Sequence, residues 1–514
     1  MTAILTKQAP AFGDEPASTP PSGIAGDNSR SPLLHLRAPE PDLSRASFGV
    51  ILVVVIVAAL IVRLHDLGDG LWYDEIDTLV HYVRQPLGYI VGTFDNKNQH
   101  VLYSVLAHWS TASFGDSAWA LRLPAALLGV ASIAALAWFG AIVTSRAEAL
   151  AASALLALSY HHVWFSQNAR GYTGLMLATL IASGMLVKMT SEATPKLRLA
   201  VAYAITMGLA LYIHLTAALI VAGHGLWWLA LIIARRERPI WPTAWLPFVG
   251  FALSAVFALV LYIPVLSKLL PTLLAPSVGG TTAEWRNPLW FVSETTQVLA
   301  RGLPGGWLTF ALAVAIAVGG LISYARRSPA ITALVLLPAF VTGTTILVAE
   351  HNLWPRFFFF AAGFGALIVM RGIFVVARLL WPSRARELAL AVATLVVLAS
   401  ASTVPRAWNP KQDYLAARNF VDRASRPGDA VVTVDMTEVP FIDMYGRPWL
   451  LAVNREQLAS IEAAHARTFV LLTFPVRVAA ISPDLWAYVQ RNYIKAAEFR
   501  GTVTGGEIIV MTTR

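Results

Sequence analysis

The first long apolar run of the chain reads FGVILVVVIVAALIVRL, residues 48–64, and Leu71-Trp72-Tyr73-Asp74-Glu75 follows after a short gap. A helix rises ~1.5 Å per residue and the hydrocarbon core is ~30 Å thick, so a run of this kind predicts a membrane span. It starts too late for a signal peptide, and we expect it to remain uncleaved. Ionisable groups beside a span are costly and usually functional. Asp74 and Glu75 are therefore the first candidate site residues.

The composition places the whole chain in the membrane class. Of 514 residues, 56% are hydrophobic and 13% are charged, and the mean hydropathy is +0.60. A soluble domain has about 25% charged residues. The net charge of +9 would suit nucleic-acid binding, but the basic residues stand in short loops between apolar runs. That pattern is typical of membrane topology, so we expect a lipid bilayer and no nucleic acid as partner. Cysteine is absent, which excludes disulfides, thiolate metal sites and cysteine nucleophiles.

The apolar runs predict an all-α polytopic membrane protein with about eleven transmembrane helices. The run over 199–234 would reach ~54 Å as one helix, which is too long for a single crossing, so we divide it at His214. The predicted spans are 48–64, 120–143, 147–164, 172–189, 199–214, 216–234, 244–266, 304–323, 331–348, 356–378 and 386–404.

Basic residues are concentrated in every second loop, which predicts the orientation. The positive-inside rule puts these loops, and with them the N-terminus, in the cytoplasm, and the C-terminal segment outside. Residues 1–47, rich in Pro, Ser and Gly, are predicted to be a disordered cytoplasmic tail, and 48–404 to be the membrane domain. The basic loop residues are Arg146, Lys188, Lys196, Arg198, Arg235, Arg236, Arg238, Arg326, Arg327, Arg378, Arg384 and Arg386.

This threading brings most of the suggestive polar residues to the outer side. The first outer loop, 65–118, also contains two amphipathic stretches, 76–84 and 86–94, which we expect to lie as helices at the membrane interface. Later outer loops place charged residues beside aromatic ones. We therefore expect a polar site at the outer surface, drawn from Asp74, Glu75, Lys97, His100, Arg170, Tyr172, Glu350, His351 and Arg356.

The last part, 405–514, is predicted to be a small extracytoplasmic α/β domain. Strands are expected at 429–434, 468–473 and 507–511, and helices at 415–424, 455–464 and 483–493. Alternation of the two indicates an α/β fold. The segment contains no recognisable catalytic motif or phosphate loop, so it either helps to dock an acceptor and cover the site or is a passive appendage.

Four stretches give the chain a resemblance to the GT-C superfamily of glycosyltransferases. It resembles in particular the bacterial protein O-mannosyltransferase and lipid A aminoarabinose transferase group, glycosyltransferase family 39-like. His100-Val101-Leu102 departs from a common His-Pro-Pro, and Asn168 stands where many relatives have an acid, which leaves donor and acceptor open. The stretches are 72–75, 98–103 with 114–117 and 120–124, 164–172, and 351–357.

The resemblance implies an integral membrane glycosyltransferase in the plasma (inner) membrane of a bacterium. It would move a sugar from a polyprenyl-phosphate-linked donor to a hydroxyl of a lipid, glycan or protein, with inversion. Asp74 would be the base and Glu75 would orient the acceptor or a cation. A cation that stabilises the leaving phosphate is more useful than an acid. The donor phosphate and sugar would be held by Arg170, Arg356, Tyr172, His100 and Lys97.

Other interpretations remain open on the residues alone. A transporter or flippase of lipid-linked sugars would also have many spans with charges, and a glycan polymerase or ligase would share the donor. Asp74 and Glu75 could cap an interfacial helix, His100 could cap a helix, and the arginines could reach lipid headgroups. Glu350 and His351 could join the first-loop acids around a divalent cation, although no spacing demands a metal.

Overall fold

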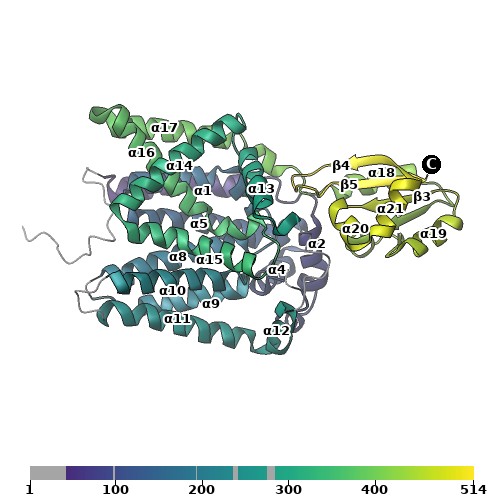
Figure 1. The fold of residues 1–514 in the computed structure, drawn as a ribbon, viewed down its shortest axis with the longest axis horizontal. Coiled ribbons are helices and arrows are strands. Elements are labelled where there is room, and N and C mark those ends of the chain that lie inside the picture. Colours follow the sequence, from purple (N-terminus) through teal and green to yellow (C-terminus); the bar gives the residue numbers. More distant parts are fainter. Residues whose placement is uncertain (1–41, 97–98, 193, 235–240, 275–283, 514) are drawn as a thin grey trace, which may run out of the picture.

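The computed structural model describes residues 42–96, 99–192, 194–234, 241–274 and 284–513. A bundle of long helices forms the membrane domain, and a small domain of strands and short helices stands at one end of it (Figure 1). The predicted tail, 1–47, lies outside the described residues except for 42–47, where α1 begins at Arg45.

Within the described residues, nine helical stretches are long and apolar enough to cross a membrane. Each predicted apolar run contains helix, and the bend at His214 falls between two helices as expected. The bundle helices are α1 (Arg45–Leu64), α5 (Ala118–Val143), α6 (Arg146–Ala157), α7 (Tyr160–Ser166), α8 (Tyr172–Ser191), α9 (Leu197–Ile213), α10 (Ala217–Ala234), α11 (Trp241–Tyr262), α14 (Trp307–Arg327), α15 (Pro329–Val348), α16 (Ala362–Leu380) and α17 (Ala385–Ala401).

Two of the eleven predicted spans are shorter than expected. The 17 residues of α9 reach only ~26 Å. The run over 147–164 is broken into α6 and α7, because the buried guanidinium of Arg63 donates to the carbonyl of Ala157 at 2.9 Å, where α6 ends. The same guanidinium lies 2.6 Å from His162 Nδ1. A broken helix inside a bundle needs such a partner for its freed carbonyls.

Short helices roof the bundle at the end that bears the C-terminal domain (Figure 1). The two stretches expected at the interface form α2 continued by the π-helix η2, and α3. The bounds of the short elements here are α2 (Tyr73–Thr78), η2 (Leu79–Val83), α3 (Leu87–Gly92), α4 (Val101–Phe114), η3 (Ile263–Val265), α12 (Leu266–Leu274), η4 (Glu284–Arg286), α13 (Pro288–Arg301), η5 (Pro355–Ala361) and η7 (Val404–Trp408). A further short helix, η6 (Pro382–Arg384), lies between α16 and α17.

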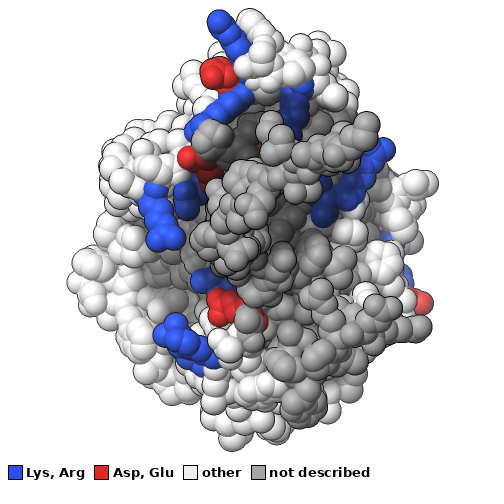
Figure 2. Space-filling model, turned by 90° about the vertical axis from the view of Figure 1, so that its left-hand side faces the viewer, with Lys and Arg blue, Asp and Glu red and all other residues white. Residues whose placement is uncertain are grey.

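Within the bundle, α14 and α16 cross in close contact. A Cβ at Gly320 would stand 2.0 Å from the carbonyl oxygen of Ile368, and one at Gly372 would stand 2.0 Å from that of Ile316. Only glycine allows the two backbones to approach so closely. On the end of the bundle away from the C-terminal domain, Lys and Arg are the prevailing charges where the surface is described (Figure 2).

The C-terminal domain contains a five-stranded sheet with the order β2-β1-β3-β5-β4. β1 pairs in parallel with β2 and β3, whereas β5 runs antiparallel to β3 and β4. The sequence analysis did not predict β2, β4 or α20. The elements are α18 (Tyr414–Ala424), β1 (Ala430–Thr433), η8 (Asp435–Thr437), η9 (Val439–Met444), β2 (Leu450–Leu451), α19 (Arg455–Ala463), β3 (Thr468–Leu472), α20 (Pro475–Ile481), α21 (Pro483–Asn492), β4 (Tyr493–Phe499) and β5 (Ile508–Thr513).

One hydrophobic core is shared by the C-terminal domain and the first outer loop. Phe469 and Leu471 of β3 point to one face of the sheet, as the two-residue period of a strand requires. There they join Tyr414 of α18 together with Leu71 and Ile76 of the first loop in a single buried cluster. The domain is thus packed against the segment that contains Asp74 and Glu75.

Candidate functional site

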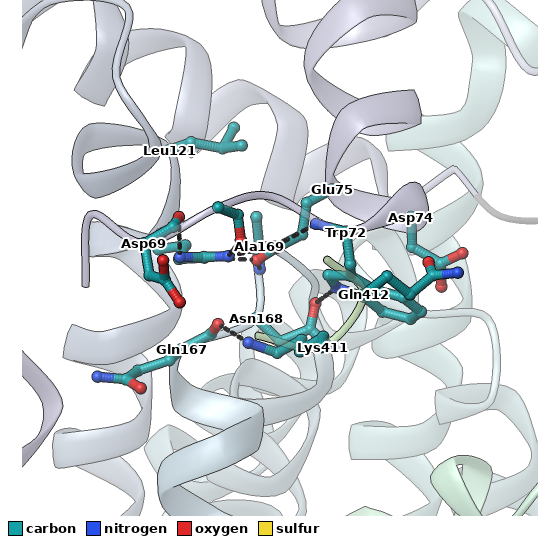
Figure 3. Close-up of polar contacts among 12 residues, drawn as sticks. Asp69, Trp72, Asp74, Glu75, Leu121, Gln167, Asn168, Ala169, Lys411 and Gln412 are labelled. Carbon is teal, nitrogen blue, oxygen red and sulfur yellow. Dashed lines mark hydrogen bonds and ion pairs between the residues drawn. The ribbon is translucent and has the colours of Figure 1, made fainter. Parts of the chain in front are cut away.

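The two adjacent carboxylates of α2 lie in different surroundings. Successive residues of a helix are about 100° apart, so neighbouring side chains face different ways. Glu75 points into the protein toward Ala169, whereas Asp74 points away from it (Figure 3). Both are buried, with 0% of Glu75 and 6% of Asp74 exposed.

Glu75 is fully engaged in a buried ion pair with Arg122. Arg122 Nη2 lies 2.6 Å from Oε2 and its Nε donates to Oε1 at 2.8 Å. The backbone N–H groups of Ala169 and Trp72 also donate to the carboxylate, at 2.8 and 3.3 Å. Burial alone would raise the pKa of Glu75, but Arg122 and then Lys411 outweigh it, so that the pKa is lowered. Glu75 is therefore an ionised group that fixes α2 to the bundle.

Asp74 has the opposite character, because its Oδ2 is buried and accepts no hydrogen bond from the residues that the structure describes. The guanidinium of Arg356 lies beside it, with Nη1 3.7 Å from that oxygen. Buried polar atoms normally find a hydrogen-bond partner, so an open carboxylate oxygen beside a guanidinium indicates a place for a ligand. The predicted Asp74 and Arg356 are thus brought together from segments 282 positions apart in the sequence, as their numbers 74 and 356 show.

Three further predicted residues, Arg170, His100 and Tyr172, form one cluster next to α2. Arg170 is buried and donates to Thr78 Oγ1 at 3.1 Å, one turn along α2 from Asp74. His100 Nδ1 accepts the backbone N–H of Gly171 at 3.2 Å, and its ring meets that of Tyr172 edge to face, 5.6 Å between centroids. Burial, followed by Arg170, lowers the pKa of His100 well below its usual value, so the ring is neutral.

Gly171 is required by the closeness of this cluster. A Cβ there would stand 2.6 Å from the carbonyl oxygen of Ile213 and 2.8 Å from His100 Nδ1. Ile213 ends α9, and His214 follows it, with its ring 4.6 Å from that of His100. The bend at His214 therefore delivers a second imidazole to the cluster.

A cavity of about 140 Å³ opens beside the cluster, between the membrane domain and the C-terminal domain. Aromatic rings form most of its wall, Arg356 and Arg301 line it, and Asn168 faces it with an Nδ2 that is buried and makes no hydrogen bond. Aromatic walls suit sugar rings, and guanidinium groups suit phosphate. Its aromatic lining residues are Trp72, Tyr160, Trp164, Phe165, Tyr172 and Trp354.

Two residues at the start of the C-terminal domain reach into this site. Lys411 Nζ donates to the carbonyl of Gln167 at 2.6 Å (Figure 3). The backbone N–H of Tyr73 donates to Gln412 Oε1 at 3.1 Å. Gln412 Nε2 in turn donates to the carbonyl of Gly506 at 2.9 Å. We call residues 410–412 the strap, since they tie the loop before Asn168 and the start of α2 to the C-terminal domain.

The tip of the β4–β5 hairpin closes another side of the cavity. The N–H groups of Thr502 and Val503 donate to the carbonyls of Pro410 and Lys411 at 2.9 and 3.1 Å. Trp164 Nε1 donates to Thr502 Oγ1 at 2.8 Å. The cavity thus has a wall that comes from the C-terminal domain.

Two predicted site residues, Glu350 and His351, lie elsewhere, and a third is not described. Lys97 lies outside the described residues. Glu350 is exposed, with 79% of its side chain accessible, and pairs with Arg286 at 3.2 Å in a surface hollow that His351 also lines. Among the described residues, no group of three or more His, Asp or Glu side chains is placed to hold a metal ion. The proposed cation site of Glu350 and His351 with the first-loop acids is therefore not formed by these residues.

Sequence reasoning missed several residues of the site. Arg122 lies in the stretch 120–124, one of those that carry the resemblance, but the sequence indicates no role for it, because its partner Glu75 is 47 positions away. Lys411 and Gln412 follow the last span and lack any local pattern. Thr502 and Arg301 come from segments without a motif. Only the fold shows that these residues line or support one cavity.

Comparison with known proteins supports the fold at low identity. No protein-family model and no curated protein matches the chain. Among solved structures, ArnT from Cupriavidus metallidurans in the apo state has a TM-score of 0.52 at 14% identity, over 91% of this chain and 98% of that one. The oligosaccharyltransferase of Archaeoglobus fulgidus, solved with Zn and sulfate, has a TM-score of 0.53 at 14% identity, over 89% and 74%.

The archaeal oligosaccharyltransferase AglB, from the same organism, was also solved with an inhibitory peptide and a dolichol-phosphate. Its TM-score is 0.52 at 12% identity, over 90% of this chain and 74% of that one. These proteins are GT-C glycosyltransferases. The chain therefore has the GT-C fold, which confirms the fold that its sequence motifs predicted.

Proposed function

We propose that the protein is an integral membrane glycosyltransferase that moves a sugar from a polyprenyl-phosphate-linked donor to an acceptor hydroxyl. One observation supports this most directly: the open Oδ2 of Asp74 stands 3.7 Å from Arg356, which lines an aromatic cavity. A base, a phosphate-binding cation and rings that accept a sugar are the three parts that such a transfer requires.

In the proposed reaction, Asp74 Oδ2 takes the proton of the acceptor hydroxyl while the hydroxyl oxygen of the acceptor attacks the anomeric carbon of the donor sugar. The bond from that carbon to the donor phosphate oxygen breaks, and polyprenyl phosphate leaves with the electron pair. Arg356 binds the developing negative charge, and Arg170 supports α2 from below through Thr78. One displacement inverts the anomeric centre.

Glu75 has a positioning role in this proposal. Its four hydrogen bonds leave it committed to Arg122, Ala169 and Trp72. This differs from a glycosidase, in which two carboxylates stand on opposite sides of the sugar. Asn168 Nδ2 and His100 are the further polar groups at hand, the first facing the cavity and the second held neutral beside Tyr172.

We place the reaction on the outer side of a bacterial plasma membrane. The cavity is at the end of the bundle that bears the C-terminal domain, and the basic loops are at the other end (Figures 1 and 2). The positive-inside rule supports a cytoplasmic position for the basic end.

The test compares Asp74→Asn with a matched variant of the same helix. Asp77 is also buried on α2, but its Oδ1 contacts His81 at 3.0 Å, whereas Asp74 Oδ2 lies 3.7 Å from Arg356, which lines the cavity. With the full chain in nanodiscs and a panel of polyprenyl-phosphate sugars, we expect Asp74→Asn to lose about 10²-fold or more in turnover, while donor binding persists. Asp77→Asn should stay within about threefold of the wild type.

Two outcomes would contradict the proposal. Equal activity of Asp74→Asn and wild type would remove Asp74 from the chemistry. Donor binding by wild type without transfer to any acceptor extract would favour a transporter of lipid-linked sugars. Parallel assays with EDTA and with Mg²⁺ decide whether a divalent cation takes part.

A further inference from the structure

A second cavity lies at the opposite end of the membrane domain, remote from Asp74. It has a volume of about 270 Å³ and is bounded by α6, α14, α16 and α17. None of its lining residues lines the cavity beside Asp74. The proposed sugar transfer gives it no role.

The lining is strongly basic. Five arginines and two carboxylates surround the cavity, so positive charges exceed negative ones by three. Lys and Arg are the prevailing charges on this end of the molecule (Figure 2). The five arginines are Arg326 and Arg327 at the end of α14, Arg371 and Arg378 on α16, and Arg386 on α17.

Both carboxylates are already occupied. Glu148 pairs with buried Arg371 at 2.8 Å and accepts from Thr144 Oγ1 at 2.6 Å. The two oxygens of Asp42 accept the backbone N–H groups of Arg146 and Ala147, at 2.9 and 3.3 Å, where α6 begins. Arg326 and Arg327 at the end of α14 are exposed and line the cavity, so a ligand entering it would meet these two guanidinium groups.

The other wall of the cavity is apolar and faces the surroundings of the bundle. Ile322 and Leu379 line it and are exposed large apolar residues, Leu379 by 75%. Phe374 and Val375 of α16 continue this wall. An arginine-rich mouth joined to a lipid-facing apolar wall matches a molecule with a phosphate headgroup and acyl chains.

We propose that this cavity binds the phosphate headgroup of an anionic diacyl lipid from the leaflet at this end of the membrane domain. The guanidinium groups of Arg326 and Arg327 contact the phosphate oxygens, since guanidinium binds phosphate through paired N–H donors. Basic pockets between membrane helices are a known way of holding anionic lipid headgroups. The acyl chains lie along Ile322 and Leu379.

General attraction between a basic face and an anionic leaflet is the competing explanation, and the chain offers a control for it. Arg384 belongs to η6 in the adjoining loop, and its guanidinium lies 5.5 Å from the Trp381 ring centroid, outside the cavity lining. Arg326→Gln and Arg384→Gln each remove one charge from the same end. Only the first removes it from the cavity.

The experiment uses the full-length protein, delipidated in detergent and titrated with dioleoyl-phosphatidylglycerol or dioleoyl-phosphatidylcholine, with bound lipid counted by native mass spectrometry. We expect wild type to prefer phosphatidylglycerol by about tenfold or more. Arg326→Gln, and separately Arg327→Gln, should lose about tenfold in affinity for it, whereas Arg384→Gln should match wild type. Arg371 stays unchanged, because its loss would leave Glu148 unpaired.

Three results would overturn the proposal. Equal losses in Arg326→Gln and Arg384→Gln would mean attraction by the whole face. Equal affinity of wild type for the two lipids would remove the charge recognition. Displacement of the lipid by inorganic phosphate at the same concentration would make the cavity a site for free phosphate. Melting temperatures of all variants show whether each is folded, and Arg327→Gln serves if Arg326→Gln is not.

Discussion

At the scale of single residues, two adjacent carboxylates have different roles: Glu75 stabilises the fold, and Asp74 is the proposed base. Glu75 neutralises the guanidinium of Arg122, which is itself 3% exposed and has no other carboxylate as a hydrogen-bond partner among the described residues. Asp74 presents an oxygen that no donor satisfies. Stability should therefore depend on Glu75 and turnover on Asp74.

Glu75→Gln should unfold at a clearly lower temperature than wild type. The change leaves the Arg122 charge buried without its counter-charge, and removal of one partner of a buried pair costs about 3–5 kcal/mol. Asp74→Asn should leave the melting temperature within about 2 °C, because Oδ2 accepts no hydrogen bond. Thermal unfolding in detergent measures both.

The double variant Glu75→Leu with Arg122→Met checks the cause. It removes both charges together, so it should be less destabilised than the sum of the two single changes. Additive losses would show that the two side chains act independently, contrary to their 2.6 Å contact.

His100 should make the folded protein sensitive to acid. Its pKa is lowered well below the usual value, first by burial and then by Arg170. The unfolded chain therefore binds a proton below pH ~6.5 that the folded protein does not, and stability falls as pH drops below that value. His100→Asn keeps a short acceptor for the Gly171 N–H and removes the titration. Its melting temperature should fall less between pH 7 and 5 than that of wild type.

His214 shifts in the same direction and contributes to the slope that remains in His100→Asn. Burial, then Arg170 and Arg356, lowers its pKa to about 3. The difference between wild type and His100→Asn, measured at each pH, isolates the contribution of His100. Parallel curves would contradict the neutral state of His100.

At the scale of elements, the sequence predicted those parts that are decided by local pattern. Apolar runs located the long helices, and the length of the run over 199–234 located the bend at His214, since one helix cannot reach ~54 Å across a ~30 Å core. The break between α6 and α7 was missed because it depends on Arg63, about a hundred positions away. β4 was missed because most of its residues are exposed or half-buried and lack clear alternation.

The site shows the same difference between residues that a local pattern reveals and residues that only long-range contacts reveal. Asp74, Arg170 and Arg356 were found as charged residues beside apolar runs. The structure places Arg356, which lines the cavity, beside Asp74 at the start of α2, and Arg170 beside Thr78 at the end of the same helix. Arg122, the strap and the hairpin tip are defined by contacts between distant segments. A single sequence contains no local signal for such contacts.

The strap leads to a prediction about alkaline pH. Lys411 is buried between Gln167 and the Trp164 ring, and burial lowers its pKa to about 7, although Glu75 opposes the shift. In the unfolded chain the amine keeps its proton up to pH ~10.4. The unfolded state therefore binds more protons between about pH 7 and 10, so Lys411 favours folding more as pH rises through this window.

Lys411→Met should show this as a pH-dependent difference. The lost hydrogen bond to Gln167 lowers stability by an amount that does not change with pH, whereas the titration disappears. Relative to the variant, wild type should gain a few °C of melting temperature from pH 7 to 9.5. Lys411→Arg, which stays charged, should lose the slope as well. A constant difference across the range would mean that Lys411 keeps its proton in the folded protein.

At the scale of the whole molecule, the fold is shared where the sequence is not. The chain matches ArnT of Cupriavidus metallidurans over 91% of its length at 14% identity. Packing of apolar helices tolerates wide exchange of side chains as long as the volume and pattern remain, so a fold outlasts its sequence. A fold alone does not determine a function, so the proposed functions rest on two local sites at opposite ends, the cavity that Arg356 lines and the arginine cavity.

The orientation of these two ends can be measured directly, because the chain has no cysteine and any introduced one is unique. Ser383 in η6 and Ser460 on α19 are both exposed serines, so replacement by cysteine changes one atom at each site. The positive-inside rule predicts that the arginine-rich end, with Ser383, is cytoplasmic. In spheroplasts treated with a membrane-impermeant maleimide, Ser460→Cys should react at once and Ser383→Cys only after permeabilisation. Labelling in the reverse order would put the Asp74 cavity in the cytoplasm, and a donor presented on the outer leaflet could not reach it.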